Sequence, residues 1–230
     1  FLKDRTLFEL TTSIAHTDPA NQNSSNHQVI YTKTPNGLNA KVLGATINLE
    51  VPVLLAPVYI EKPWGQEIWY TGIEKRGESS VMVDNNQSIP ISLFLSLAPE
   101  QLTSSKLPVL LKVLDPKPVK SLGNLYLEVH KEKEEVYVVT HIDSGAWPEG
   151  VGTMRYGIDQ VARQSYETDQ QFRAAYLSSV QEYEAIRQKV DAGLEVSTTL
   201  EEKAKLKMDR FTSVKEMRLG DVIKVPAWTP

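Results

Sequence analysis

The sequence predicts a mainly β fold, a sandwich or a barrel, interrupted by one helical stretch. Short runs of β-branched and aromatic residues recur from residue 28 onward and are divided by turn residues. Asn36-Gly37 separates two of these runs, and Asn-Gly is a strong signal for a tight hairpin. Helical spacing of apolar residues appears in a single region, residues 161–210. Many short strands at regular spacing are typical of β-sandwiches and β-barrels.

The strands are expected in order along the chain. Residues 1–27 are weakly patterned, with a short helix favoured in "KDRTLFEL" (3–10) and a polar loop after it. Strands are then predicted in "QVIYTK" (28–33), "AKVLGATINL" (40–49), "EIWYTGI" (67–73), "SSVMV" (79–83), "ISLFLSL" (91–97), "PVLLKVLD" (108–115), "NLYLEVH" (124–130) and "EEVYVVTHI" (134–142).

Two helices are predicted between the strands. Thr168-x-x-Gln171 has the form of a capping box, and Gly193 is a termination signal. Between them, apolar residues recur at helical spacing: Phe172, Tyr176, Val180, Tyr183, Ile186 and Val190. A second helix is predicted to begin at Thr198-x-x-Glu201 and to run to about Asp209. We expect the apolar stripe to pack against the β core, and residues 211–230 to return to strands.

Composition narrows the classes of function. The chain is 41% hydrophobic with a net charge of −4, which is typical of a soluble globular protein and gives no basic footprint for nucleic acid. No apolar run approaches the roughly 18 to 20 residues that span a bilayer, so we expect no membrane partner and a cytoplasmic location. Because the chain has no cysteine, any metal must be held by nitrogen and oxygen ligands.

A possible metal site lies in "LEVHKEKEEV" (127–136). On a strand, Glu128 and His130 project from one face, so a carboxylate and an imidazole point the same way. Buried together, they would be compensated by a divalent cation; on an outward face, they need no explanation beyond solvation. After the charged turn, Glu135 is the best-placed third ligand, with Glu134 as its alternate on the other face.

The spacing of these residues resembles the cupin superfamily. In its first signature, G-x5-H-x-H-x3,4-E-x6-G, Glu128 stands at the first histidine, His130 at the second and Glu135 at the glutamate. Gly220 and Pro226 match the start of the second signature, G-x5-P-x-G-x2-H. Its histidine would come one position beyond Pro230, so we expect a fragment that lacks its fourth ligand and is inactive by itself. The chain departs from the signature glycines at Leu122, Ile142 and Trp228.

A narrower resemblance links the chain to type I mannose-6-phosphate isomerases. Segments similar to "EKPWGQEIWYTG", "LPVLLKVLDPKP" and "LYLEVHKEKEEVYVV" recur in that family in this order, with glutamine at the position of Glu128. The resemblance implies a cupin-type double-stranded β-helix, that is, a jelly-roll barrel with a helical insertion. It divides the chain into an N-terminal segment (1–27), the first part of the barrel (28–160), the insertion (161–210) and the last strands (211–230).

The same resemblance implies a function and its residues. The expected reaction is a zinc-dependent interconversion of mannose 6-phosphate and fructose 6-phosphate through an enediolate, with a single divalent metal ion on Glu128, His130 and Glu135. Lys112 matches the lysine of the family's strand and is the expected active-site cation. Apart from the resemblance, Trp64 is either a wall for the sugar ring or a core residue, and Arg155 is either a phosphate clamp or an exposed surface residue. His141 is expected on a loop.

Two other functions are compatible with the same residues. A cupin that binds metal or carbohydrate without turnover, as a sensor or an accessory domain, is the main alternative. A metal-dependent oxygenase is the second, although such cupins usually keep a histidine-rich first signature. The oligomeric state, the general base and the phosphate-binding residues stay open at this point.

Overall fold

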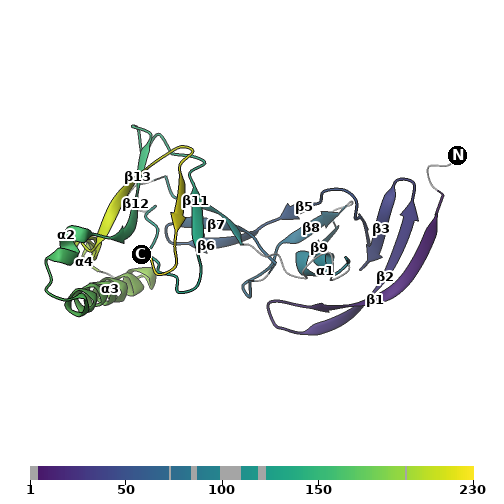
Figure 1. Cartoon of the computed structure of the whole chain (residues 1–230), viewed down its shortest axis with the longest axis horizontal. Helices are drawn as coiled ribbons and strands as arrows, with labels where there is room; N and C mark the ends of the chain where they lie inside the picture. The colour runs from purple at the N-terminus through teal and green to yellow at the C-terminus, as the bar shows by residue number, and fades with distance from the viewer. Residues whose placement is uncertain (1–4, 73, 84–86, 99–109, 119–122, 195) are drawn as a thin grey trace. The chain divides into compact units, whose positions relative to one another are not determined.

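The computed structural model describes residues 5–72, 74–83, 87–98, 110–118, 123–194 and 196–230. The chain forms two compact units, Phe1–Asp115 (unit 1) and Pro116–Pro230 (unit 2), each with its own strands (Figure 1).

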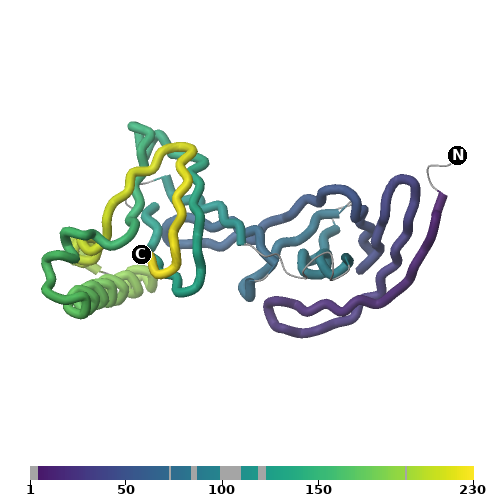
Figure 2. The backbone as a smooth tube through the Cα atoms, viewed as in Figure 1, coloured from purple at the N-terminus to yellow at the C-terminus, as the bar shows by residue number. Residues whose placement is uncertain are grey.

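Unit 1 begins with a four-stranded antiparallel meander. Its strands are β1 (Phe8–Thr17), β2 (Ser24–Thr34), β3 (Gly37–Val42) and β4 (Ala45–Asn48), which pair in chain order and follow one another as consecutive hairpins in Figure 2. The predicted hairpin is confirmed, since Thr34 pairs with Gly37, whose φ of 136° favours glycine. β1 pairs with β2 along its whole length. The short helix expected in residues 3–10 is wrong where the chain is described, because Phe8 already belongs to β1.

Two three-stranded antiparallel sheets complete unit 1. One has the order β5-β8-β9 and the other the order β10-β7-β6. The strands run over β5 (Leu54–Ala56), β6 (Val58–Lys62), β7 (Gly65–Tyr70), β8 (Ser80–Val83), β9 (Gln87–Pro90) and β10 (Leu111–Pro116).

The segment "ISLFLSL" is a helix rather than the predicted strand. Pro90 ends β9, and α1 (Ile91–Leu95) follows it. Ile91, Leu93 and Leu97 pack into the hydrophobic core of unit 1. A short apolar run without polar residues is found both in buried strands and in buried helical turns, so its sequence does not distinguish the two. The same core includes Val29, Ala40, Val42, Ala45, Ile47, Val81 and Ile89.

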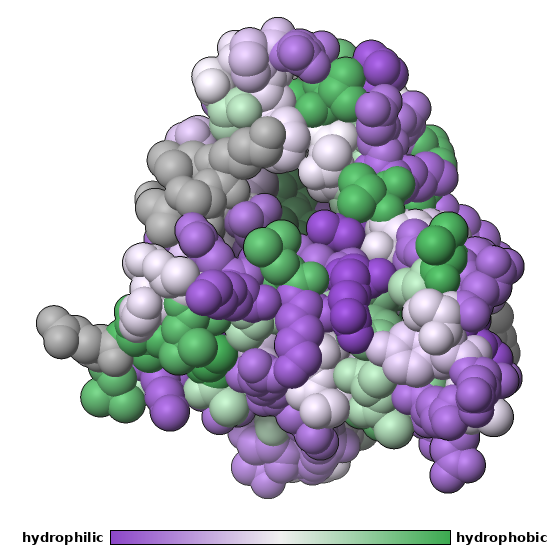
Figure 3. Space-filling model, turned by 90° about the vertical axis from the view of Figure 1, so that its left-hand side faces the viewer, coloured by the Kyte–Doolittle hydropathy of each residue, from purple (hydrophilic) through white to green (hydrophobic). Residues whose placement is uncertain are grey.

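Unit 2 combines two antiparallel ladders with three helices. The ladders join β11 (Glu135–Val138) to β14 (Val222–Val225) and β12 (Val151–Ile158) to β13 (Thr212–Arg218). The helices are α2 (Gln160–Gln164), α3 (Asp169–Asp191) and α4 (Thr198–Asp209). Figure 3 looks onto the side where α2 and α3 lie in Figure 1, and hydrophilic residues cover much of it, with separate apolar patches between them.

The helix predictions are confirmed closely. Thr168 and Gln171 form the reciprocal capping box at the start of α3, and Gly193 follows the helix with a φ of 72°. α4 covers the predicted residues, although its N-cap is Ser197. Phe172 and Tyr176 of α3 contact the ring of Phe211, with ring centroids 5.5 and 5.4 Å away. These two aromatic residues of the stripe therefore pack inside unit 2, as expected.

The molecule is mainly β, with several antiparallel sheets, and none of the sheets in the described residues closes into a barrel. The strand predicted in residues 124–130 is wrong, because these residues form neither helix nor strand. In the described part of the chain, no helix combines the length and the apolar character needed to cross a membrane.

Candidate metal centre

The proposed ligands lie on two segments of unit 2. Residues 123–130 carry Glu128 and His130 in an irregular segment, and the carbonyl of His130 accepts a hydrogen bond from the backbone N–H of Trp228 at 2.7 Å. Glu135 is the first residue of β11, where it pairs with Val225 of β14. The β11–β14 ladder and the turn after it therefore place the third ligand and anchor the second.

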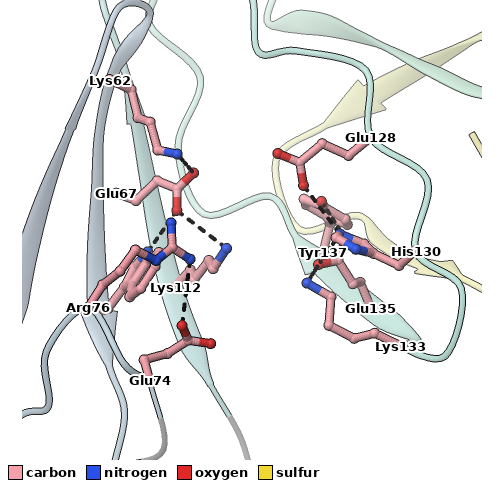
Figure 4. Close-up of polar contacts among 11 residues, drawn as sticks. Lys62, Glu67, Glu74, Arg76, Lys112, Glu128, His130, Lys133, Glu135 and Tyr137 are labelled. Carbon is pink, nitrogen blue, oxygen red and sulfur yellow. Dashed lines mark hydrogen bonds and ion pairs between the residues drawn. The ribbon is translucent and has the colours of Figure 1, made fainter. Parts of the chain in front are cut away.

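Glu128, His130 and Glu135 come together in the structure (Figure 4). His130 Nε2 lies 3.2 Å from Glu128 Oε2 and 3.4 Å from Glu135 Oε1. This nitrogen is shielded from solvent and, in the described part of the chain, makes no hydrogen bond. The sequence prediction that these three side chains converge is met, although an irregular segment rather than a strand presents two of them.

The types of the donor atoms and two of their separations match what a divalent cation would need. Bonds of about 2.0–2.1 Å from zinc to nitrogen and oxygen, at tetrahedral angles, place neighbouring donor atoms about 3.3 Å apart. The two separations at His130 bracket that value. Two carboxylates and a neutral imidazole carry two negative charges, which a divalent cation would balance. A buried imidazole nitrogen without a hydrogen bond is the kind of atom that a cation would satisfy.

A lysine already occupies part of this cluster. Lys133 Nζ lies 2.7 Å from Glu135 Oε1, the same oxygen that faces His130, and Tyr137 donates a hydrogen bond to Glu135 Oε2 at 2.8 Å. Among the described residues, no three His, Asp or Glu side chains are already arranged to hold a metal ion. The cluster is therefore an ion-pair network that includes the half-exposed Lys133.

The environment of Glu135 favours its ionised form. Partial burial raises the pKa of this carboxyl group, but the hydrogen bonds from Lys133 and Tyr137 and the charges of Lys133 and His130 outweigh it. The net result is a pKa below the ordinary value of 4.5. Glu135 is therefore ready to accept a cation at neutral pH. The alternate ligand, Glu134, instead pairs with Lys224 at 2.9 Å.

Lys112 lies in a different cluster, in unit 1. Its strand alternates, with Lys112 and Leu114 partly buried and Leu111 and Val113 exposed. The ammonium group of Lys112 lies 3.3 Å from Glu67 Oε2 and 4.9 Å from the ring centre of Trp69 (Figure 4).

Glu67 is the centre of that cluster. The side chain is only 7% exposed, and it accepts a hydrogen bond from the indole N–H of Trp69 at 2.7 Å. Lys62 Nζ lies 3.5 Å from its other oxygen. Burial raises the pKa of Glu67, but the hydrogen bond from Trp69 and the charges of Lys112 and Lys62 lower it further than burial raises it. The group is held as a carboxylate.

The other predicted site residues are engaged elsewhere. Trp64 is buried in the turn between β6 and β7. Arg155 donates to the backbone carbonyls of Asp209 and Thr212 and pairs with the Asp209 carboxylate at 3.3 Å. His141 is exposed outside the strands, as expected.

Two features escaped prediction. Glu67 and Trp69 are two residues apart on β7 and share a face, and this spacing could have identified Glu67 as a buried carboxylate. Nothing in the sequence separates Lys133 from the other charges of its turn, because its role depends on where Glu135 lies. Comparison with models of protein families, with curated proteins and with solved structures finds no match to this chain.

Proposed function

We propose that this protein is a metal-dependent aldose–ketose isomerase that acts on a sugar phosphate, with mannose 6-phosphate and fructose 6-phosphate as the preferred pair. The observation that carries the proposal is the approach of two carboxylates to the buried, unbonded nitrogen of His130. The fold proposed with it is the cupin-type double-stranded β-helix.

The strand pairing of unit 2 supports that fold. The segments that resemble the two cupin signatures are about 90 residues apart in the sequence, yet β11 of the first pairs with β14 of the second. The bond from Trp228 to His130 extends this contact beyond the ladder. Two segments that hold one metal in a cupin must lie side by side, and these do.

Glu128, His130 and Glu135 are the residues that would hold the cation, and zinc is the proposed metal because of the family resemblance. A bound divalent cation would supply positive charge to the oxyanion that develops when a proton leaves the carbon beside a carbonyl. Two carboxylates and one imidazole also suit manganese or cobalt.

Cation binding without turnover is the second candidate. It is favoured by the internal contacts of the other proposed residues, since Lys112 is paired with Glu67 and Arg155 with Asp209, while Trp64 is buried. A sensor or accessory domain needs the cation cluster alone.

A coupled assay separates the two candidates. Formation of fructose 6-phosphate from mannose 6-phosphate is followed with zinc, manganese or cobalt present, for the full-length protein and for its His130→Ala variant. Metal-dependent turnover that is lost in the variant supports the isomerase. Absence of turnover with all three metals, in a protein that still binds them, contradicts the isomerase and leaves the binding function.

A further inference from the structure

The segment that carries Glu128 and His130 has no strand ladder to hold it. Residues 123–130 lie outside the helices and strands, and the backbone N–H of Trp228 donates a hydrogen bond to the carbonyl of His130 at the end of the segment. Side chains that bind one metal ion must be held in a precise geometry. A segment that is not part of a sheet needs other contacts to hold it there.

Tyr126 supplies such an anchor two residues before Glu128. Its hydroxyl donates a hydrogen bond to Asp191 Oδ2 at 3.0 Å and accepts one from Arg187 Nη2 at 3.3 Å. The guanidinium carbon of Arg187 also lies 5.6 Å from the centre of the tyrosine ring. Both partners belong to the last turns of α3.

Arg187 is itself fixed by both long helices. Its Nη2 donates to Asp191, one turn further along α3, at 2.5 Å, and its Nη1 donates to Glu201 of α4 at 2.6 Å. The guanidinium is mostly buried, with 21% of the side chain exposed. Tyr126 therefore binds to a preorganised end of the α3–α4 pair rather than to a mobile side chain.

We propose that Tyr126, held by Asp191 and Arg187, is a positioning residue that fixes residues 124–130 so that Glu128 and His130 reach Glu135. The inference rests on the proposed cation site, and it gives the helical pair a role in building that site. If the Tyr126 hydrogen bonds favour the arrangement in which Glu128 and His130 reach Glu135, they also favour cation binding. The bound cation then stabilises the Tyr126 hydrogen bonds by the same free energy, because such coupling is reciprocal.

Cobalt binding tests the coupling. Co²⁺ is titrated into the protein and into Tyr126→Phe, which removes the hydroxyl and keeps the ring, and binding is followed by calorimetry and by the visible spectrum of the bound ion. We expect affinity to fall about tenfold, as for other groups that orient metal ligands, with a changed spectrum. Tyr166→Phe is the matched control, since its hydroxyl also bonds to an arginine, Arg210, at 2.9 Å. Equal affinity and an equal spectrum for Tyr126→Phe overturn the coupling.

Hydrogen exchange tests the tether without any metal. The peptide that covers residues 124–130 is expected to exchange faster in Tyr126→Phe than in the wild type or in Tyr166→Phe. Unchanged exchange overturns the tether itself. If the wild-type protein binds no cobalt, the proposed cation site and its coupling fail, and the exchange rates still decide whether Tyr126 holds the segment.

Discussion

The two charged clusters contain similar residues but differ in how completely their polar atoms are paired. In unit 1, the buried carboxylate of Glu67 accepts the N–H of Trp69 and faces the ammonium groups of Lys62 and Lys112. In unit 2, His130 Nε2 is buried between two carboxylates and makes no hydrogen bond with any residue that the structure describes. The first cluster is saturated by the chain's own donors, whereas the second retains an atom that a cation could satisfy.

The difference shows what separates a structural ion pair from a candidate binding site. Both Glu67 and Glu135 have a lowered pKa, so a perturbed carboxyl group does not distinguish the clusters. The distinguishing atom is the nitrogen of His130, which has no hydrogen-bond partner among the described residues, and the neighbouring Lys133 is 45% exposed. We therefore expect mutations in the first cluster to change stability, and mutations in the second to change cation binding.

The largest effect is expected from Glu67→Ala. Removing the carboxylate leaves the indole N–H of Trp69 buried without an acceptor and two ammonium groups without their counter-ion, at a cost of about 3 kcal/mol. Urea unfolding, followed by tryptophan fluorescence, measures the change in the free energy of unfolding.

Glu61→Ala is the matched control, because Glu61 is exposed on the neighbouring strand β6, and its effect should stay within about 0.5 kcal/mol. A Glu67→Ala protein as stable as this control would show that the cluster does not stabilise unit 1.

Acid should weaken unit 1 through the same carboxyl group. The pKa of Glu67 in the folded protein is below its ordinary value of 4.5. The ionised carboxylate therefore stabilises the folded state fully above pH 4.5, and this stabilisation is lost as the pH falls through the folded pKa. Urea midpoints at neutral pH and at about pH 3.5 should therefore differ more for the wild type than for Glu67→Gln. Equal losses in the two proteins would assign the acid sensitivity to other groups.

A smaller effect is expected from Lys133→Met, which removes the ammonium group that competes for Glu135 Oε1. An exposed ion pair is worth about 0.2 to 1 kcal/mol, so zinc should bind about 1.4- to fivefold more tightly to the variant. Calorimetric titration measures this, with Lys131→Met as the control because Lys131 pairs with the exposed Glu132 instead. Weaker zinc binding in Lys133→Met than in the wild type would contradict the idea that Lys133 competes with the cation for Glu135.

Local signals predicted several elements well. The capping box of Thr168 and Gln171 fixed the start of α3, and Asn36-Gly37 fixed the β2–β3 hairpin, because both depend on neighbouring residues alone. The convergence of Glu128, His130 and Glu135 was also predicted, from the spacing of a known signature.

Tertiary contacts decided the rest. Residues 91–97 form a buried helical turn instead of a strand, and a uniform apolar run gives no period to tell the two apart. Residues 124–130 alternate like a strand but pair with none, and Tyr126 instead bonds to a helix about 60 residues away in the sequence. Lys133 and Glu67 became significant only through their partners.

A zinc titration of the wild-type protein and its histidine variants shows whether Glu128, His130 and Glu135 form a cation site. We expect one bound zinc ion per chain, with binding lost in His130→Ala and unchanged in His141→Ala, whose imidazole is exposed on a loop. Glu67→Ala, measured where it is still folded, should bind zinc like the wild type. Zinc binding that survives His130→Ala would contradict the assignment of a cation site to Glu128, His130 and Glu135.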